Sequence, residues 1–416
     1  MIVIQVLRWL LLAAEIGLAL PILYLSILSV SALFTARRRR AAYARQAAVA
    51  ASNEPSVIQA PAGVRFTLLV PAHNEEAILG ILLESVAALA YPKDYYSVCV
   101  VADNCTDNTA QIARAAGARV YERFDQTQRG KGYALSWLLQ QLESDQVAYD
   151  ACVVLDADSV VDPALLRALE HELARGAQAL QAYNGVLNIA DAPSTALRWI
   201  ALALVNHVRP LGRNGLGCSS TLTGNGMCLR RDLLQRHPWR AFAIGEDYQY
   251  YLTLVAEGER ARYVPEAIVR SQMPTTFAQM KTQDVRWESP TGAQSAWRLA
   301  LNLVRAGLRH GDLTRVEAAA ELLTPPLSLL VCGSALALLA AALLWWLPVL
   351  IVSLALLVGL LLYLCAPLYL LRPPRAVYGA LLHAPRFVLW KLWVYAVLRR
   401  SKKHTAEWVR TSRTVS

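Results

Sequence analysis

The stretch ACVVLDAD, residues 151–158, decides the fold of this chain. An apolar run with β-branched residues is typical of a strand buried in a parallel sheet, and this run ends in two carboxylates, Asp156 and Asp158. Open α/β sheets bind ligands at the carboxyl edge of their strands. Two carboxylates there favour a divalent cation shared with a phosphate-bearing substrate, because Mg²⁺ takes one or two carboxylates together with substrate oxygens. The alternative is a solvated strand end, and the short pattern alone does not choose between the two.

Strands and helices alternate on both sides of this stretch. The sequence predicts strands at 65–70, 96–102, 118–122 and 151–156, and helices at 75–89, 107–116, 132–142 and 163–173. Alternation of this kind indicates βαβ units and a mainly parallel sheet. The loops at its carboxyl edge are then expected to build the site.

The composition points to a membrane protein. The chain has 416 residues, enough for two or three domains, and 55% of them are hydrophobic. The 41 Lys and Arg exceed the 31 Asp and Glu by 10, and they stand mainly beside apolar spans, which favours an anionic membrane surface and argues against nucleic acid as a partner. The seven cysteines form no Cys-x-x-Cys pair, so neither a zinc site nor a disulfide framework is expected.

The apolar stretches predict the domain organisation. The N-terminal run is long enough to cross a bilayer and is followed by four arginines at 37–40, which the positive-inside rule places in the cytoplasm. We expect a transmembrane helix (1–36), a basic juxtamembrane linker (37–63), a cytoplasmic α/β domain (64–290), interfacial helices (291–324), two transmembrane helices (325–372), and an interfacial or re-entrant helix with a basic cytoplasmic tail (373–416). Whether 378–398 spans, re-enters or lies on the membrane stays open.

Polar residues follow the first three predicted strands. Acidic and amide groups at 71–76 and 103–107 are suited to hydrogen bonds with a base and a ribose, and Lys131, between two glycines, is suited to a phosphate at a helix start. For each loop alone, a turn with a helix cap explains the residues equally well, as for Asn74 and Asp107. The chain has neither a P-loop nor a Gly-x-Gly-x-x-Gly fingerprint after a strand.

The order of the short motifs resembles family 2 glycosyltransferases, and more narrowly their membrane-embedded branch of cellulose, hyaluronan and poly-N-acetylglucosamine synthases. The motifs are VPAHNEE at 70–76, ADNCTD at 102–107, GKG at 130–132, DAD at 156–158, GED at 245–247 and QDVRW at 283–287. The resemblance implies a GT-A-type nucleotide-sugar-binding domain with a mainly parallel sheet. One departure is Gly245, where close relatives often carry Thr.

The resemblance also implies roles for single residues. Asp158 would bind Mg²⁺ or Mn²⁺, Asp247 would be the catalytic base, and Glu246 and Trp287 would contact the acceptor. The residues that it assigns to the UDP-sugar donor are Pro71, Glu75, Asp103, Lys131, Asp156, Gln283 and Arg286. Inverting transfer needs this set, because a base must take the acceptor proton while cations stabilise the departing diphosphate.

The implied activity is an inverting transfer of a sugar from a UDP-sugar to a growing polysaccharide, by an integral protein of the bacterial inner membrane. A single addition to a membrane lipid is the alternative, since three or four spans are few to enclose a polysaccharide path without an oligomer or an export partner. A non-catalytic sensor is a third hypothesis. It is disfavoured because Asp156, Asp158 and Asp247 are all present.

Overall fold

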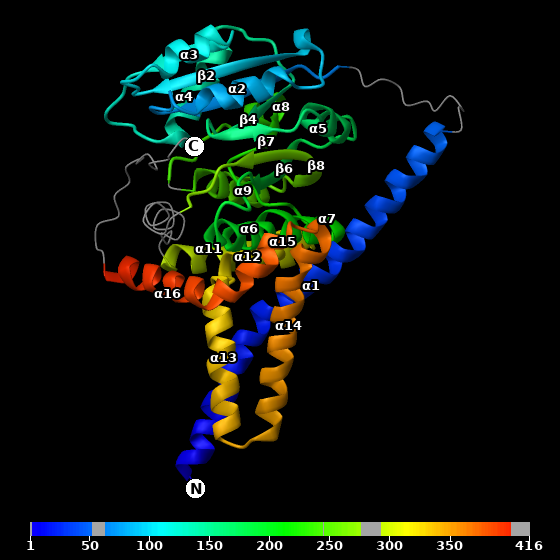
Figure 1. Cartoon of the computed structure of the whole chain (residues 1–416), viewed down its shortest axis with the longest axis vertical. Coiled ribbons are helices and arrows are strands. Elements are labelled where there is room, and N and C mark those ends of the chain that lie inside the picture. Colours follow the sequence, from blue (N-terminus) through cyan, green and yellow to red (C-terminus); the bar gives the residue numbers. More distant parts are fainter. Residues whose placement is uncertain (1, 52–62, 244, 276–292, 401–416) are drawn as a thin grey trace. The chain divides into compact units, whose positions relative to one another are not determined.

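The computed structural model describes residues 2–51, 63–243, 245–275 and 293–400, and its elements are labelled in Figure 1. The chain forms two compact units. We call them the sheet unit, residues 42–195 and 219–289 with the tail 401–416, and the helical unit, residues 1–41, 196–218 and 290–400. Each unit is therefore assembled from segments that lie far apart in the sequence.

The sheet unit is built on one mixed sheet. Its described strands are β1 (Phe66–Ala72), β2 (Tyr96–Asp103), β3 (Arg119–Arg123), β4 (Ala151–Val154), β5 (Ser159–Val161), β6 (Ala179–Val186), β7 (Met227–Arg230) and β8 (Ala261–Ser271). They are ordered β3-β2-β1-β4-β7-β6-β8-β5. The pairs within β3-β2-β1-β4 and the pair β6–β8 are parallel, whereas β7 runs antiparallel to β4 and β6, and β5 runs antiparallel to β8. The mainly parallel sheet predicted from the sequence is confirmed.

Helices cover the sheet unit. They are α2 (Leu79–Ala87), η1 (Lys93–Tyr95), α3 (Thr109–Ala115), α4 (Lys131–Ser144), α5 (Leu165–Ala174), α8 (Arg231–Arg236), α9 (Glu246–Ala256) and the start of α6 (Pro193–Ala203). Helix α2, which corresponds to the helix predicted at 75–89, begins at Leu79, four residues later than predicted. Its predicted first turn instead belongs to a loop in which Asn74 has a positive φ of 56°.

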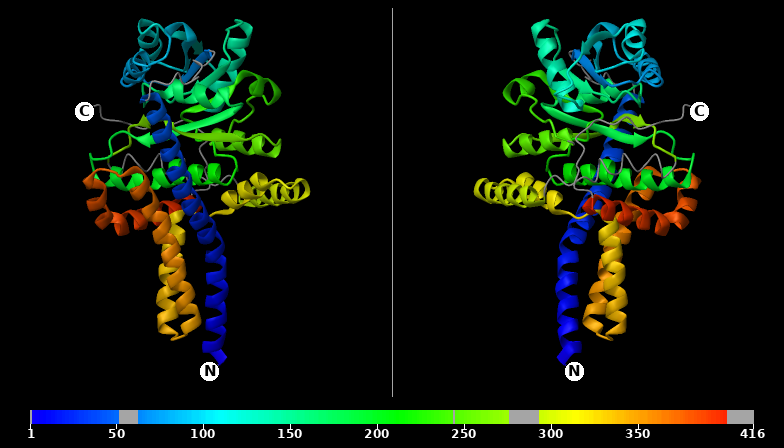
Figure 2. Two further views of the ribbon diagram at one scale, coloured as in Figure 1. Left: turned by 90° about the vertical axis from the view of Figure 1, so that its right-hand side faces the viewer. Right: turned by 90° about the vertical axis from the view of Figure 1, so that its left-hand side faces the viewer.

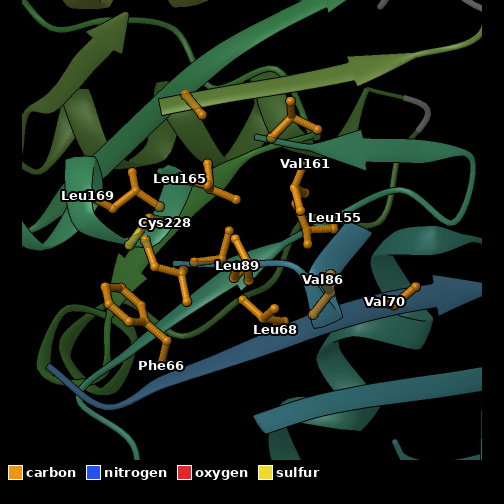
Figure 3. Packing of buried hydrophobic residues seen from close by; sticks show 14 of the residues in the cluster. Phe66, Leu68, Val70, Val86, Leu89, Leu155, Val161, Leu165, Leu169 and Cys228 are labelled. Atoms are coloured by element: carbon orange, nitrogen blue, oxygen red, sulfur yellow. The ribbon is translucent and has the colours of Figure 1, made fainter. Parts of the chain in front are cut away.

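The packing of the core explains why the sequences of β1 and β4 are apolar throughout. Figure 3 shows Phe66, Leu68 and Val70 of β1 packed with residues of α2 and α5. Helix α4 also contacts β1 and β2, and its buried leucines are not part of that cluster. A sheet covered on both faces has no polar alternation, so its central strands are apolar throughout.

Among the described residues of the helical unit, all regular secondary structure is helical. Its elements are α1 (Ile2–Ala51), most of α6, the π-helical turn η2 (Leu204–Val208), α7 (Arg209–Gly215), α11 (Ala293–His310), α12 (Leu313–Leu323), α13 (Leu327–Leu343), α14 (Leu347–Leu371), α15 (Arg375–Ala380), η3 (Leu381–His383) and α16 (Ala384–Arg400). Helix α1 continues to Ala51, so the helix does not end where a linker from residue 37 was expected. The alanines, arginines and glutamine of this segment are strong helix formers.

Two described helices, α1 over Ile2–Ala41 and α14, are long and apolar enough to cross a membrane. Helix α13 has 17 residues, and together with α12, across a bend of 70°, it is a third candidate span. Helices α13 and α14 run beside α1 (Figures 1 and 2). Arg8 of α1 donates to the carbonyl of Leu344 at 2.9 Å, and Ser353 of α14 hydrogen-bonds to Glu15 of α1.

The remaining helices of this unit are amphipathic or broken. On α11, Trp297, Leu301 and Leu308 are exposed, whereas Leu303 is buried, as expected for a helix whose apolar side lies in lipid. The apolar stretch 378–398 is divided among α15, η3 and α16 and is not among the candidate spans in the described part of the chain.

An ionic cluster links four helices of the helical unit. Arg213 of α7 is fully buried, and its guanidinium contacts Glu317 at 2.6 Å and Glu321 at 2.7 Å, both on α12. Arg209, one turn earlier on α7, contacts the second oxygen of Glu321 at 2.9 Å. Two arginines and two glutamates thus neutralise one another inside the unit.

Two tyrosines complete the ionic cluster. The hydroxyl of Tyr24 on α1 donates to Glu317 at 2.5 Å, and Arg209 donates to the hydroxyl of Tyr363 on α14 at 2.6 Å. Because α1 and α14 are the two candidate spans, the cluster joins both of them to α7 and α12.

We expect Arg213→Ala to destabilise the protein strongly, because it leaves buried carboxylates without their cation. Breaking a buried ion pair costs about 3–5 kcal/mol. Thermal unfolding of the purified full chain in detergent measures the effect. Arg309→Ala, which removes an exposed arginine of α11, is the control. Equal unfolding temperatures for the two variants would contradict the structural role of the ionic cluster.

Candidate active site

Lys131 lies at the centre of the polar residues at the carboxyl edge of the sheet. It is the first residue of α4 and follows Gly130, whose φ is 127°. Its ammonium donates to Asp156 Oδ1 at 2.6 Å and to the carbonyl of Gly224 at 3.3 Å, and it lies 3.9 Å from Glu246 Oε1. Burial disfavours its charge, but Asp156 and Glu246 outweigh that effect and raise the pKa of Lys131, so the ammonium stays charged.

The loop at 223–226 reaches this edge because β7 is antiparallel to β4. The N–H of Gly226 donates to the carbonyl of Val154 at 2.8 Å, and the N–H of Asp156 donates to Asn225 Oδ1 at 3.2 Å. Asn225 is buried and donates to the hydroxyls of Ser159 and Ser271 at 2.9 Å and 3.0 Å. These hydrogen bonds hold the backbone that carries Asp156 and Asp158.

Gly224 makes the close approach in this loop possible. It has a φ of 76°, and a Cβ at this position would lie 2.9 Å from Asp247 Oδ2 and 3.2 Å from Lys131 Nζ. The backbone of Gly224 therefore lies directly against both groups, in a space that the Cβ of any other residue would occupy. We call this close approach the cradle at Gly224.

The pair Glu246 and Asp247 opens α9. Its N-cap residue, Gly245, is left-handed with a φ of 81°, and Asp247 Oδ1 accepts from the N–H of Tyr248 at 2.8 Å. Burial, followed by repulsion from Glu246, raises the pKa of Asp247 to about 7, and Lys131 opposes this shift. A carboxylate with a pKa near neutrality can both accept and release a proton at physiological pH.

A second buried pair lies at the ends of β2 and β3. Asp103 is 1% exposed, and its Oδ1 accepts from Arg123 at 2.7 Å and from the amide of Asn104 at 3.2 Å. Burial raises the pKa of Asp103, although the hydrogen bond from Arg123 opposes the shift. The backbone carbonyl of Asp103 also lies 2.7 Å from His73 Nδ1.

The loops after β1 and β2 bind each other. Asn74 Oδ1 accepts from the N–H of Thr106 at 2.8 Å, and the N–H of Glu75 donates to the hydroxyl of Thr109 at 2.8 Å. Asp107 accepts from the N–H of Thr109 at 3.0 Å at the start of α3. Asp107 therefore forms a turn just before α3, whose N-cap residue is Asn108 and not Asp107 as predicted, and Asn74 links the two loops instead of capping a helix.

The residues at the end of β4 fit a hard divalent cation. Asp156 and Asp158 are half-buried carboxylates in the loop after β4, and Asp156 shares Lys131 as a partner with the carbonyl of Gly224. Within residues 2–51, 63–243, 245–275 and 293–400, no group of three or more His, Cys, Asp or Glu could hold a metal. This donor set suits Mg²⁺ or Mn²⁺ completed by substrate oxygens, because such ions take few protein carboxylates.

The structure brings together Lys131, Asp156, Glu246 and Asp247: Lys131 contacts Asp156 and lies near Glu246, and Gly224 approaches both Lys131 and Asp247. Pro71 lies inside β1, where it is buried and pairs with Val101. The motif at 283–287, with Gln283, Arg286 and Trp287, lies outside the described residues, so its roles stay predictions.

Sequence reasoning missed two functional neighbours. Arg123 forms an ion pair with Asp103. The feature of the sequence that could have indicated it is the position of this basic residue directly after the third predicted strand. Gln181, in β6, donates to the carbonyl of Asn225 at 2.8 Å and accepts from the N–H of Thr223 at 2.9 Å. No local pattern in the sequence marks Gln181, because the loop that it contacts is brought there by the pairing of β6 with β7.

Comparison with known proteins agrees with this geometry. The model of one family, described as Glycosyltransferase like family 2, matches residues 61–289, which is more than half of the chain. The chain belongs to this family. It is a glycosyltransferase with a GT-A-type domain, and the membership predicted from the motifs is confirmed.

Curated relatives share the same region. Probable glycosyltransferase YdaM of Bacillus subtilis is 26% identical over 233 residues, which cover 54% of each chain. Beta-monoglucosyldiacylglycerol synthase of Synechocystis is 28% identical over 229 residues, 53% of this chain and 46% of the relative. N-acetylglucosaminyltransferase of Rhizobium leguminosarum is 26% identical over 296 residues, 67% of each. The match thus spans about half the length of the first two relatives.

A solved structure shares the fold. Mannosyltransferase PcManGT from Pyrobaculum calidifontis, determined in complex with GDP-Man and Mn²⁺, superposes with a TM-score of 0.54 at 19% identity. The alignment covers 95% of this chain and 98% of that chain. This similarity establishes the fold of the glycosyltransferase.

The cradle at Gly224 makes a direct test available. We expect Gly224→Ala to lower the rate of sugar transfer by about tenfold to a hundredfold, because the new methyl group displaces Asp247 or Lys131. Release of nucleoside diphosphate measures the rate.

Gly117→Ala is the matched control for this variant. Gly117 has a φ of 80°, close to that of Gly224, but a Cβ there would meet nothing within 4 Å. Both substitutions carry a similar backbone strain of about 1–2 kcal/mol. If both variants lost activity equally, backbone strain and not the close approach to Asp247 and Lys131 would be the cause.

Proposed function

We propose that this glycosyltransferase transfers a sugar from a UDP-sugar, with inversion, to a lipid acceptor at the membrane. The observation that carries the proposal is the position of Lys131, whose ammonium contacts Asp156 and the Gly224 carbonyl and lies near Glu246. The ammonium of Lys131 thus lies close to Asp156, which follows β4, and to Glu246, which opens α9, at one edge of the sheet. A negatively charged donor, a cation and a base are then brought to one place.

In this proposal each group has one task. Asp158 holds Mg²⁺ or Mn²⁺, which supplies positive charge to the departing diphosphate when bound. Asp156, Asp103 and Glu75 orient the donor, with Lys131 free to exchange its contact with Asp156 for a phosphate oxygen. Asp247 takes the proton of the acceptor hydroxyl.

The pKa of Asp247 supports its assignment as the base. A general base works best when its pKa lies near the working pH, because it is then largely ionised and still accepts a proton readily. Burial and Glu246 bring the pKa of Asp247 to about 7, far above that of an ordinary aspartate. Glu246, the other acid of the pair, is assigned to the acceptor.

The few candidate spans favour a lipid over a growing polysaccharide. Two described helices, or three with the bent pair, cross a membrane by length and composition. This is few for enclosing a sugar-conducting path. Three relatives are beta-monoglucosyldiacylglycerol synthases, named for a lipid product, at 26–28% identity. We place the sheet unit in the cytoplasm, because the arginines at 37–40 follow the first span.

A panel of labelled UDP-sugars tests this function on the full chain in lipid nanodiscs. We expect one donor to yield UDP and a singly glycosylated lipid in the presence of Mn²⁺ or Mg²⁺. Asp158→Ala should remove the metal dependence of donor binding, measured by calorimetry with the UDP-sugar, whereas exposed Asp94→Ala should leave it unchanged. A long polymer on product sizing would reject the lipid acceptor, and donor binding by Asp158→Ala that still needs metal would reject the ligand assignment.

The base makes transfer depend on pH. We expect kcat/KM to rise with pH and to level off above about 7, because Asp247 must lose its proton before it can accept one. Asp247→Asn should bind the donor and stop transfer. Asp232→Asn, at an exposed acid of α8, is the control and should keep the wild-type profile. Normal turnover by Asp247→Asn would disprove its role as the base.

A further inference from the structure

A cavity of ≈ 600 Å³ lies in the helical unit, between α1 and the end of α7. Its apolar lining comes mainly from Leu23, Ile27, Val30 and Phe34, which lie on one face of α1 at spacings of three and four residues. All four are exposed, between 41% and 59%. Because these side chains are exposed, the cavity is an open groove along α1 and not an enclosed pocket.

The chemistry of the cavity changes along α1. The hydroxyl residues Ser26, Ser31 and Thr35 are interspersed with the apolar residues, and the guanidinium of Arg38 lies beyond them all on α1. From Leu23 to Arg38 the helix rises about 22 Å, which exceeds half of the hydrocarbon thickness of a bilayer. A mainly apolar length that ends in a cation matches the acyl chain and the phosphate of a lipid in one leaflet.

Arg38 differs from its neighbours in the arginine run. Arg37 hydrogen-bonds to Tyr369, and Arg40 donates to the carbonyl of Leu370 at 2.9 Å, so both are engaged with α14. Arg38 instead lines the cavity and is exposed. Its charge is therefore presented to whatever occupies the cavity.

The wall of the cavity is held rigidly. The hydroxyl of Ser31 donates to the carbonyl of Gly212 at 2.7 Å, which fastens α7 against α1. At Gly215, a Cβ would clash with the hydroxyl oxygens of Ser31 and Thr35, so the two helices touch at this point. The cavity thus belongs to a fixed crossing of two helices.

We propose that this cavity binds one phosphate-bearing membrane lipid, with an acyl chain along Leu23–Phe34 and its phosphate at Arg38. The cavity lies on α1 within the candidate span Ile2–Ala41 and on the adjoining end of α7, so lipid would surround it if this helix crosses the membrane as its length and composition allow. Charge complementarity selects an anionic headgroup, since a guanidinium binds phosphate through paired hydrogen bonds. The site is independent of which sugar or acceptor the enzyme uses.

Native mass spectrometry of the full chain with phosphatidylglycerol or phosphatidylcholine tests the proposal. The wild-type protein should retain one phosphatidylglycerol in preference to phosphatidylcholine. Arg38→Gln should weaken phosphatidylglycerol retention by about tenfold, as the loss of a charge-assisted hydrogen bond does. Val30→Trp should weaken the retention of both lipids, because the indole fills the apolar part of the cavity.

Matched variants outside the cavity are Arg375→Gln, at the exposed first residue of α15, and Val358→Trp, at an exposed valine of α14. Both should bind phosphatidylglycerol as the wild type does, and Arg38→Lys should recover part of the binding. Excess inorganic phosphate should not displace the lipid, because it lacks the acyl chain. Equal retention of the two lipids by the wild type, or unchanged retention by both Arg38→Gln and Val30→Trp, would overturn the proposal, as would a second copy of the chain in place of the lipid.

Discussion

The site depends on one electrostatic constraint, the neutralisation of several carboxylates by the ammonium of Lys131. Asp156 follows β4, whereas Glu246 and Asp247 open α9, and gathering these acids in a partly buried site would be costly without a cation. Lys131 contacts Asp156 at 2.6 Å and lies 3.9 Å from Glu246. Burial and repulsion from Glu246 nevertheless raise the pKa of Asp247, against the opposing charge of Lys131. Lys131 thus limits the electrostatic cost of gathering these acids, whereas burial and Glu246 set the pKa of Asp247.

The topology of the sheet brings the loops that carry these charged residues to one edge. Strands β1, β2 and β4 are parallel and in register, so their carboxyl ends deliver the loops at 72–76, 103–107 and 155–158 to one edge. Strand β7 enters antiparallel to β4, so the loop before it arrives at the same edge from the opposite direction. Gly224 and Asn225 can then support Asp156 through their backbone and side chain. A purely parallel sheet would not place that loop there.

The helical unit contains two described helices that are long and apolar enough to cross a membrane, where lipid would compete for their surfaces. The hydrophobic effect contributes little between helices in a bilayer, so packing and polar contacts must supply specificity. The ionic cluster of Arg209, Arg213, Glu317 and Glu321 does so with every charge paired. Its arginines belong to the segment 196–218, which stands in the sequence between β6 and β7. The chain thus passes through the helical unit immediately before it forms the loop at Gly224.

The sequence alone determined the strands of the first half of the domain, the motifs and the apolar spans, because each depends on local patterns of hydrophobicity and charge. It predicted a buried strand over 151–156 with acids at its end; the structure confirms the buried strand but ends it at Val154, so Asp156 and Asp158 lie in the loop that follows. It could not show that α1 continues beyond the arginines, nor that Arg123 pairs with Asp103. Only the tertiary structure decided which loop supports Asp156, which cation balances Asp247 and how α7 meets α1. These contacts join residues tens to hundreds of positions apart, and no local pattern encodes such distances.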